Sequence, residues 1–249
     1  MAAPRPLRNP PITEALVDIR FAGTPPDETV LEPLRRQLAG RYPQVEARRA
    51  MQADFKVEKK ELKGGPVADL GFVGLFFKSA NEKLLAQFRR DGFTLNQLSS
   101  YVDAPRLFSE ALDLWTRYAE LVKPEAVIRL ALRYINRLNL PLNDQDDLER
   151  FLLAAPNLPV GLGGGITDFI SRVSSRDRER RITTIVTQKL LQPSKDDGTV
   201  PLILDLDVFT DGTLDCSAMN LQRHLEELRA VKNTAFFGSL SEETIKLYE

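Results

Sequence analysis

The sequence predicts an α+β protein of two similar halves that form one broad, mainly antiparallel twisted sheet, with the long helices on one face. The first observation is the order of elements, which runs strand, helix, three strands and helix, and begins again at Val127. The second is that both opening strands, LVDIRF and IRLALRYINRL, hold charged side chains within an apolar run. Element order alone therefore divides the chain into 1–124 and 125–249, which we expect to form one integrated unit.

The first half begins with an irregular arm followed by a strand. Four prolines within residues 1–11 remove backbone donors and prevent a regular element there. Apolar residues at every second position predict a strand at 15–21. Leucines at helical spacing then predict a helix at 31–38, in which Pro33 is tolerable only within the first turn. Three further strands are predicted by alternation, at 51–62, 68–79 and 83–89.

Glycines and a long apolar stripe organise the rest of this half. Turns are predicted at 63–66 and at Asp91-Gly92. Gly71 and Gly74, within the strand at 68–79, indicate a bulge or a close approach of two backbones. A helix is predicted by apolar residues on one stripe, namely Phe108, Leu112, Trp115, Ala119 and Val122. Its stripe favours a core position for Trp115 over a role in stacking on a ligand.

The second half repeats this order. A strand at 127–138 is followed by a short helix at 146–153 and by strands at 166–174, 181–191 and 202–209, with a turn at Asp211-Gly212. Leucines from position 221 onward mark a helix, and Phe236 and Phe237 are expected to anchor a bend. Ser239 and Glu242 have capping-box spacing and predict a last short helix.

Composition excludes some classes of protein. Thirty-four basic and thirty-five acidic side chains give a net charge of −1, which argues against a dedicated duplex-binding protein and still allows a local basic patch. The single cysteine, Cys216, cannot form an internal disulfide, so we expect a reducing, cytoplasmic location. No apolar run approaches the roughly 18 residues of a membrane span, and we expect no membrane association.

Several segments resemble the landmarks of a known family. They are Asn9-Pro10-Pro11-Ile12 followed by Glu14-Ala15-Leu16, Asp91-Gly92-Phe93-Thr94, Leu132-Arg133-Tyr134-Ile135-Asn136, Leu204-Asp205-Leu206-Asp207, and Phe236-Phe237 with Ser239. Together they resemble a sporadically distributed prokaryotic family of uncharacterised proteins, along nearly the whole chain. The resemblance implies a patchily inherited bacterial accessory protein from a mobile or defence-linked neighbourhood. It supplies no catalytic residues.

Charged residues placed on strands form the candidate site. Because strand residues two apart share a face, we expect one face of the sheet to collect charges opposite the apolar, helix-packed face. The candidate ligand- or partner-binding residues are Asp18, Arg20, Arg129, Arg133, Arg137, Asp205 and Asp207. Opposite charges on neighbouring strands can pair across the ladder. The face is therefore either solvated and self-neutralising, or concave and able to bind a polar ligand or a partner strand.

Three functions remain open from these residues. The leading hypothesis is a non-enzymatic binding or adaptor protein with a protein partner, without cofactor, metal or catalytic residue. The alternative is nucleic-acid binding through the three arginines of the strand at 127–138, because arginine forks match phosphate geometry. A third is a Mg²⁺-dependent hydrolase that uses Asp205 and Asp207, with Asp18 as a possible third carboxylate. His224, the only histidine, has no partner that would indicate zinc.

Overall fold

The computed structural model describes residues 5–58, 61–98, 101, 103–142, 148–192 and 198–249, with only the backbone described at 54–58 and 61–66. These residues form one nine-stranded antiparallel sheet and five helices, which confirms the α+β class. No helix of this described part is long and apolar enough to cross a membrane.

The strands are distributed along the sequence between the helices. They are β1 (Ile12–Ala22), β2 (Gln44–Glu58), β3 (Glu61–Lys78), β4 (Leu84–Arg89), β5 (Gly92–Gln97), β6 (Ala126–Leu140), β7 (Ile170–Asp177), β8 (Ile182–Leu190) and β9 (Val200–Leu214). The helices are α1 (Glu28–Leu38), α2 (Ala104–Val122), α3 (Leu148–Phe151), α4 (Ala218–Ser239) and α5 (Glu242–Lys246). The order across the sheet is β2-β3-β4-β5-β1-β6-β9-β8-β7, so β1 and β6 lie side by side at its centre.

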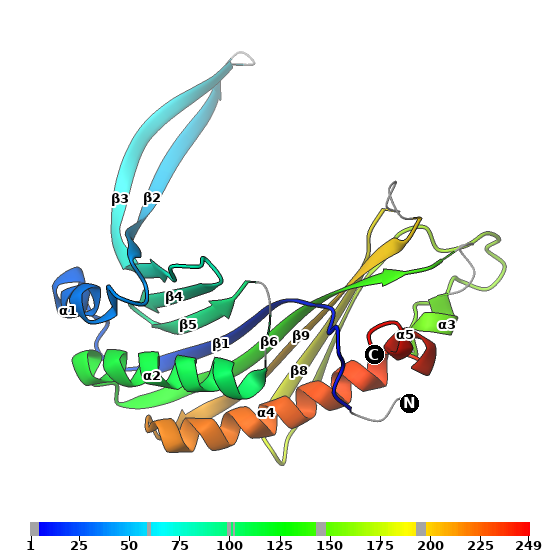
Figure 1. Cartoon of the computed structure of the whole chain (residues 1–249). Helices are drawn as coiled ribbons and strands as arrows, with labels where there is room; N and C mark the ends of the chain where they lie inside the picture. Colours follow the sequence, from blue (N-terminus) through cyan, green and yellow to red (C-terminus); the bar gives the residue numbers. More distant parts are fainter. Residues whose placement is uncertain (1–4, 59–60, 99–100, 102, 143–147, 193–197) are drawn as a thin grey trace.

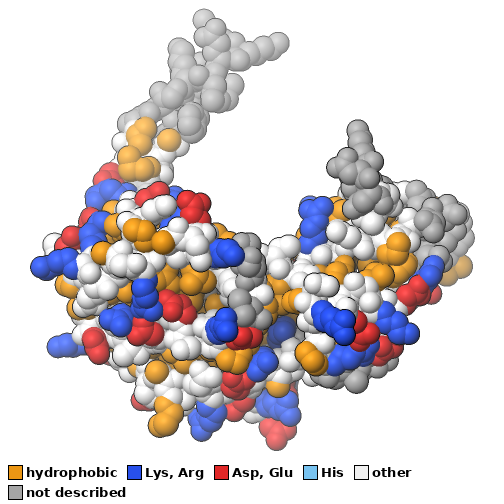
Figure 2. Space-filling view, viewed as in Figure 1, with side chains coloured by type: hydrophobic (Ala, Val, Ile, Leu, Met, Phe, Trp, Pro, Cys, Tyr) orange, Lys and Arg blue, Asp and Glu red, His pale blue; other side chains and the backbone are white. Residues whose placement is uncertain are grey.

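Both ends of the sheet curve away from helices α2 and α4 (Figure 1). At one end the long β2–β3 hairpin projects from the body, and at the other the ends of β6, β8 and β9 project away from the helices. Helix α2 contacts β1 and β5, and α4 contacts β6, β8 and β9. The space-filling view shows a hollow between these two ends of the sheet (Figure 2).

Alternation along the strands builds the core between sheet and helices. Val17 and Ile19 of β1 are fully buried, as are Leu204 and Leu206 of β9. The larger apolar cluster includes side chains from both ends of the chain, from β1 to α4. Trp115 lies within it with no exposed surface and donates from Nε1 to the Cys216 carbonyl oxygen at 2.9 Å, which confirms the predicted core position.

The first half differs from its predicted order because it contains four strands after α1, where three were expected. The strand missing from the prediction is β5, whose six residues begin at Gly92 and are almost all buried. The turn predicted at 63–66 lies within β3, and the strands pair as far as Glu58 and Glu61, so the connection falls on 59–60, outside the described residues. The glycines at 64 and 65 lie at a register shift of the β2–β3 ladder where β3 has one residue more than β2, and glycine often accompanies such a bulge.

Four further predictions about local structure were wrong. Pro33 lies inside α1, beyond its first turn, and its missing N–H removes one hydrogen bond of the helix. Asp211 and Gly212 lie within β9, because Gly212 takes a φ of +125° and the strand continues to Leu214. Similarly, the predicted bend at Phe236-Phe237 is the last part of α4. The last short helix is confirmed as α5, but its cap is Ser241, which accepts from the Thr244 N–H, and not Ser239, which ends α4.

The glycines of β3 behave as predicted. A Cβ on Gly74 would lie 2.3 Å from the Phe88 carbonyl oxygen of β4, so the two backbones approach closely. Gly71 has a φ of +99° and lies between two register shifts of the β2–β3 ladder. The prediction of a bulge or a close approach is confirmed at both positions.

Candidate functional site

The sheet brings six of the seven candidate residues together on the face opposite α2 and α4. Antiparallel pairing places Arg20 of β1 opposite Arg129 of β6, and Arg133 of β6 opposite Asp207 of β9. We call this surface the charged face; it comprises Asp18, Arg20, Arg89, Arg129, Arg133, Asp205 and Asp207. The residues come from β1, β4, β6 and β9, so the face exists only in the assembled sheet.

Asp18 is the hub of the charged face. Its side chain is only 10% exposed. Oδ1 accepts from Arg129 Nη1 at 3.0 Å and Arg20 Nε at 3.2 Å, and Oδ2 accepts from Thr94 Oγ1 at 2.7 Å and Arg89 Nη2 at 2.9 Å. Burial alone would raise the pKa of Asp18, but the Thr94 hydrogen bond and the charges of Arg20 and Arg89 outweigh it and lower the pKa. The carboxylate is therefore held ionised.

The two aspartates of β9 are also paired with arginines. Arg133 donates to Asp205 from Nε at 2.8 Å and from Nη2 at 2.5 Å, a two-point contact that raises the pKa of Arg133. Arg129 Nη2 lies 3.2 Å from Asp207, and its guanidinium stacks over the Phe209 ring with 4.4 Å to the centroid. Arg129 thus bridges the carboxylates of Asp18 and Asp207.

Asp207 differs from Asp18 in the direction of its pKa. Burial raises the pKa of Asp207, and the charges of Arg129 and Arg133 do not fully compensate. A raised carboxyl pKa means that the folded protein binds the proton more tightly than the unfolded chain. Stability is therefore lost as the pH rises from the unfolded-chain pKa through the raised pKa of Asp207, and the loss is complete above it.

We expect Asp207→Asn to leave the free energy of unfolding at pH 7 unchanged or higher by less than about 1 kcal/mol, because it removes a desolvated charge and one partly exposed ion pair. Urea unfolding at pH 4 and pH 7 measures this, and the variant should gain relative to the wild type as the pH rises. If Asp207→Asn instead lowered the free energy of unfolding at pH 7 by more than about 1 kcal/mol, the upper value for an exposed ion pair, ionised Asp207 would stabilise the protein and the prediction would be wrong.

Sequence reasoning missed two members of the hub, Arg89 and Thr94. Because β5 was not predicted, nothing fixed the register of β4 and β5 against β1. The signal was the Asp91-Gly92 turn, which makes a hairpin in which Arg89 pairs with Gly92. Asp91, within this turn, joins the same network. Its carboxylate pairs with Arg20, and its Oδ1 lies 3.1 Å from Arg89 Nε.

Arg137 is the one candidate that the structure does not join to the others. It lies further along β6 with an exposed side chain, and no ion pair of Arg137 occurs among the described side chains. Its backbone N–H donates to the Pro11 carbonyl oxygen at 2.8 Å and so ties the N-terminal arm to β6.

A small hollow borders the charged face between β6 and β7. Its volume is about 200 Å³, and it is lined by Arg133, Arg172, Ile185, Thr187, Asp205 and Asp207. Arg133 is 42% exposed, which makes it the most accessible arginine of the charged face. Within the described part of the chain, no group of three or more His, Cys, Asp or Glu side chains is placed to hold a metal ion.

Comparison of the sequence with models of protein families gave no match, and a search of curated proteins gave none either.

Proposed function

We propose that the protein is a non-enzymatic binding or adaptor module that holds another protein in the hollow above its charged face. Its resemblance to a patchily inherited family supports a role as an accessory component of a bacterial mobile or defence-linked system, and its single cysteine supports action in the cytoplasm. The proposal depends mainly on one observation, the mutual pairing of the charges on this face.

The pairing favours a protein partner over a nucleic acid. Four arginines and four aspartates are joined in ion pairs, and they are Arg20, Arg89, Arg129, Arg133, Asp18, Asp91, Asp205 and Asp207. A surface that binds the phosphate backbone gains affinity from an excess of cations, and these arginines are already neutralised. Half-buried Leu16, Ile135 and Ile185 lie among them, and arginine beside apolar side chains is common in protein interfaces.

The two edges of the sheet support the same partner class. Strands β2 and β7 are the edge strands, and an edge presents unpaired backbone groups to which an extended peptide can add. Met51 on β2 and Ile170 on β7 are 60% and 71% exposed. A partner lying in the hollow would meet the charged face below it and an edge strand at each end of the sheet.

We further propose that the two halves arose by duplication and place their long helices on one face. In both, the first strand lies at the centre, with the last, penultimate and earlier strands outward in turn, as β1-β5-β4-β3-β2 and β6-β9-β8-β7. The long helices α2 and α4 each follow the last strand of a half, contact each other, and run below the sheet in Figure 1. This arrangement leaves the charged face for a partner.

Arg133→Glu is expected to weaken partner binding at least tenfold, because it reverses the charge of the most exposed arginine of the face and repels Asp205. The measurement is a tagged purification from the native host, with quantitative mass spectrometry of co-purifying proteins and an absorbance ratio for nucleic acid. Arg223→Glu on α4 is the matched control, because it makes the same charge change on the helix side of the sheet.

Arg172→Glu provides a second test that leaves the ion-pair network intact, since no ion pair of Arg172 occurs among the described side chains. A stoichiometric protein lost from both Arg133→Glu and Arg172→Glu and retained by Arg223→Glu supports the proposal. A partner retained by all three variants overturns it. Co-purifying nucleic acid that dissociates in high salt would instead favour the arginine alternative.

A further inference from the structure

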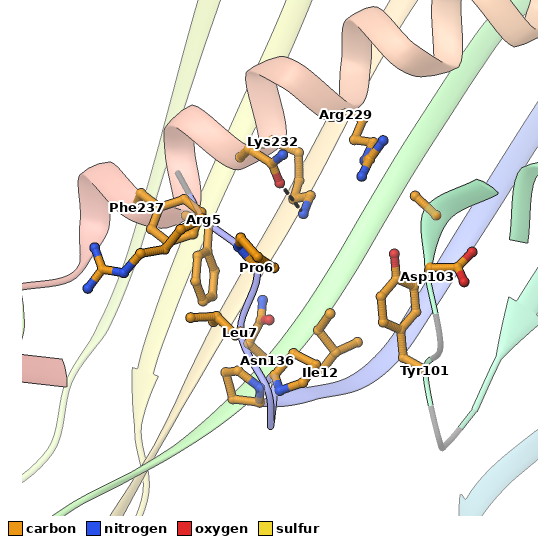
Figure 3. Close-up of a pocket in the computed structure, with 15 residues that line it drawn as sticks. Arg5, Pro6, Leu7, Ile12, Tyr101, Asp103, Asn136, Arg229, Lys232 and Phe237 are labelled. Carbon is orange, nitrogen blue, oxygen red and sulfur yellow. Dashed lines mark hydrogen bonds between the residues drawn. The ribbon is translucent and has the colours of Figure 1, made fainter. Parts of the chain in front are cut away.

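A second cavity lies on the helix side of the sheet, away from the charged face. It has a volume of about 420 Å³, within the range of small-molecule sites. Its walls are the N-terminal arm (residues 5–11), α4, β6 and the segment that leads into α2 (Figure 3). We call it the arm pocket; one part is lined by Leu7, Ile12 and Phe237 and another by Tyr101, Arg229 and Lys232.

The arm that closes this pocket is tied down along its length. Asn9 donates its backbone N–H to the Tyr248 carbonyl oxygen at 3.1 Å, and Pro11 accepts from the Arg137 N–H. Arg5 forms ion pairs with Glu242 at 2.8 Å and with Glu249. The prolines of the arm lack N–H donors, so this wall offers mainly apolar surface to a ligand.

Lys232 extends from α4 into the pocket, beside Arg229 and toward Tyr101 (Figure 3). Its Nζ donates to Asn233 Oδ1 at 2.7 Å and lies 4.2 Å from the centroid of the Tyr134 ring. Among the described residues, no carboxylate forms an ion pair with Lys232. Burial, with a smaller contribution from Arg229, lowers the pKa of Lys232 to about 8, so the ammonium form predominates at pH 7.

The other charged and titratable groups around Lys232 leave its charge uncompensated. Arg229 pairs with Glu226 at 3.2 Å. Asp103, on the segment before α2, caps that helix by accepting from the Arg106 N–H at 2.8 Å and pairs with the Arg106 side chain. Arg5, on the arm, is already paired with Glu242 and Glu249. Burial raises the pKa of both Tyr101 and Tyr134, so both remain neutral at pH 7.

Two polar groups add directional contacts. The hydroxyl of Tyr101, which lines the pocket, lies 2.9 Å from that of Tyr134; when the Tyr134 hydroxyl donates, the Tyr101 hydroxyl retains its hydrogen for a ligand. Asn136 is 99% buried and lines the pocket; its Nδ2 donates to the Leu204 carbonyl oxygen at 2.9 Å. No donor to Asn136 Oδ1 occurs among the described residues, which leaves this oxygen as an acceptor.

We infer that the arm pocket binds a small molecule with an anionic group, a carboxylate or a phosphate, on an apolar body. Lys232 and Arg229 contact the anion, and Leu7, Ile12 and Phe237 contact the apolar part. An ammonium without a carboxylate partner at the wall of a cavity of this volume is complementary to such a ligand. The site is separate from the charged face, so this inference stands or falls independently of the protein partner.

Calorimetric titration of the full chain tests the inference with three matched probes, hexanoate, hexyl phosphate and the neutral hexanamide. We expect saturable binding of at least one anion at pH 7, at least tenfold tighter than hexanamide, and the stronger anion identifies the headgroup. Lys232→Met should weaken that binding at least tenfold. Lys246→Met, on α5 outside the pocket, should leave it unchanged.

The pH profile provides a readout that does not depend on the fold of Lys232→Met. Because the Lys232 ammonium deprotonates near pH 8, anion affinity in the wild type should fall between pH 7 and pH 9.5. In Lys232→Arg the charge persists over this range, so the affinity should hold. The inference is overturned if neither anion binds, if hexanamide binds equally well, or if Lys232→Met and the rise in pH leave the affinity unchanged.

Discussion

Asp18→Ala is expected to lower the free energy of unfolding by about 3–5 kcal/mol, the usual result of removing one partner from a buried ion pair. The substitution leaves Arg89, whose side chain is only 13% exposed, without its closest carboxylate contact. Arg129 loses one of its two aspartates, and the Thr94 hydroxyl loses its acceptor. Urea unfolding followed by circular dichroism measures the effect.

Asp91→Ala is the matched control for Asp18→Ala. Asp91 pairs with the same Arg20 and Arg89, yet its side chain is 62% exposed. Exposed ion pairs contribute at most about 1 kcal/mol because water screens them. Equal losses in the two variants would show that burial does not set the strength of this network.

The pH dependence separates Asp18 from a simple packing effect. Its pKa is lowered in the folded protein, so the ionised carboxylate contributes stability above the unfolded-chain pKa, about 3.9. This contribution is lost as the pH falls from there through the lowered pKa. The difference between wild type and Asp18→Ala should therefore be full at pH 7 and shrink below pH 4; a constant difference would exclude an electrostatic origin.

Gly92→Ala is expected to cost about 3 kcal/mol, the upper part of the range for added volume in a packed core. A Cβ at this position would lie 2.3 Å from the Ile19 carbonyl oxygen, so β1 and β5 would have to separate. That separation would also stretch the Thr94 hydrogen bond to Asp18. Backbone atoms make this contact, so no change of rotamer can relieve it.

Gly40→Ala is the control for Gly92→Ala. Gly40 follows α1, and a Cβ there would meet no atom within 4 Å. Its effect on the urea midpoint should be close to zero. If Gly92→Ala were equally neutral, β1 and β5 would have to lie further apart than they do in the structure.

The charged face could be predicted from sequence because strand geometry has a strict period of two. Apolar Val17 and Ile19 assign one face of β1, which places Asp18 and Arg20 on the other. The same reasoning groups Asp205 with Asp207 on β9. The pairing of Asp18 with Arg89 could not be predicted, because it depends on the register of β5, a strand whose continuous burial shows no alternation.

The arm pocket had no comparable signal. Its walls come from Leu7, Tyr101, Asn136 and Lys232, which are separated along the chain and meet only through tertiary packing. Lys232 is the one lysine of α4, and among the other polar residues of that helix nothing in the sequence distinguishes it from an exposed side chain. Its burial depends on the N-terminal arm, for which the prolines predicted only an irregular course.

The central position of β1 has a consequence for synthesis of the chain. This strand is made first, yet one of its two neighbours, β6, follows more than 100 residues later. At a translation rate of about 5–20 residues per second, the nascent β1 therefore waits several seconds for that partner. During this time its edge can pair with other chains. Because such long-range strand pairing also folds slowly, we expect the newly made protein to depend on a chaperone that shields β1.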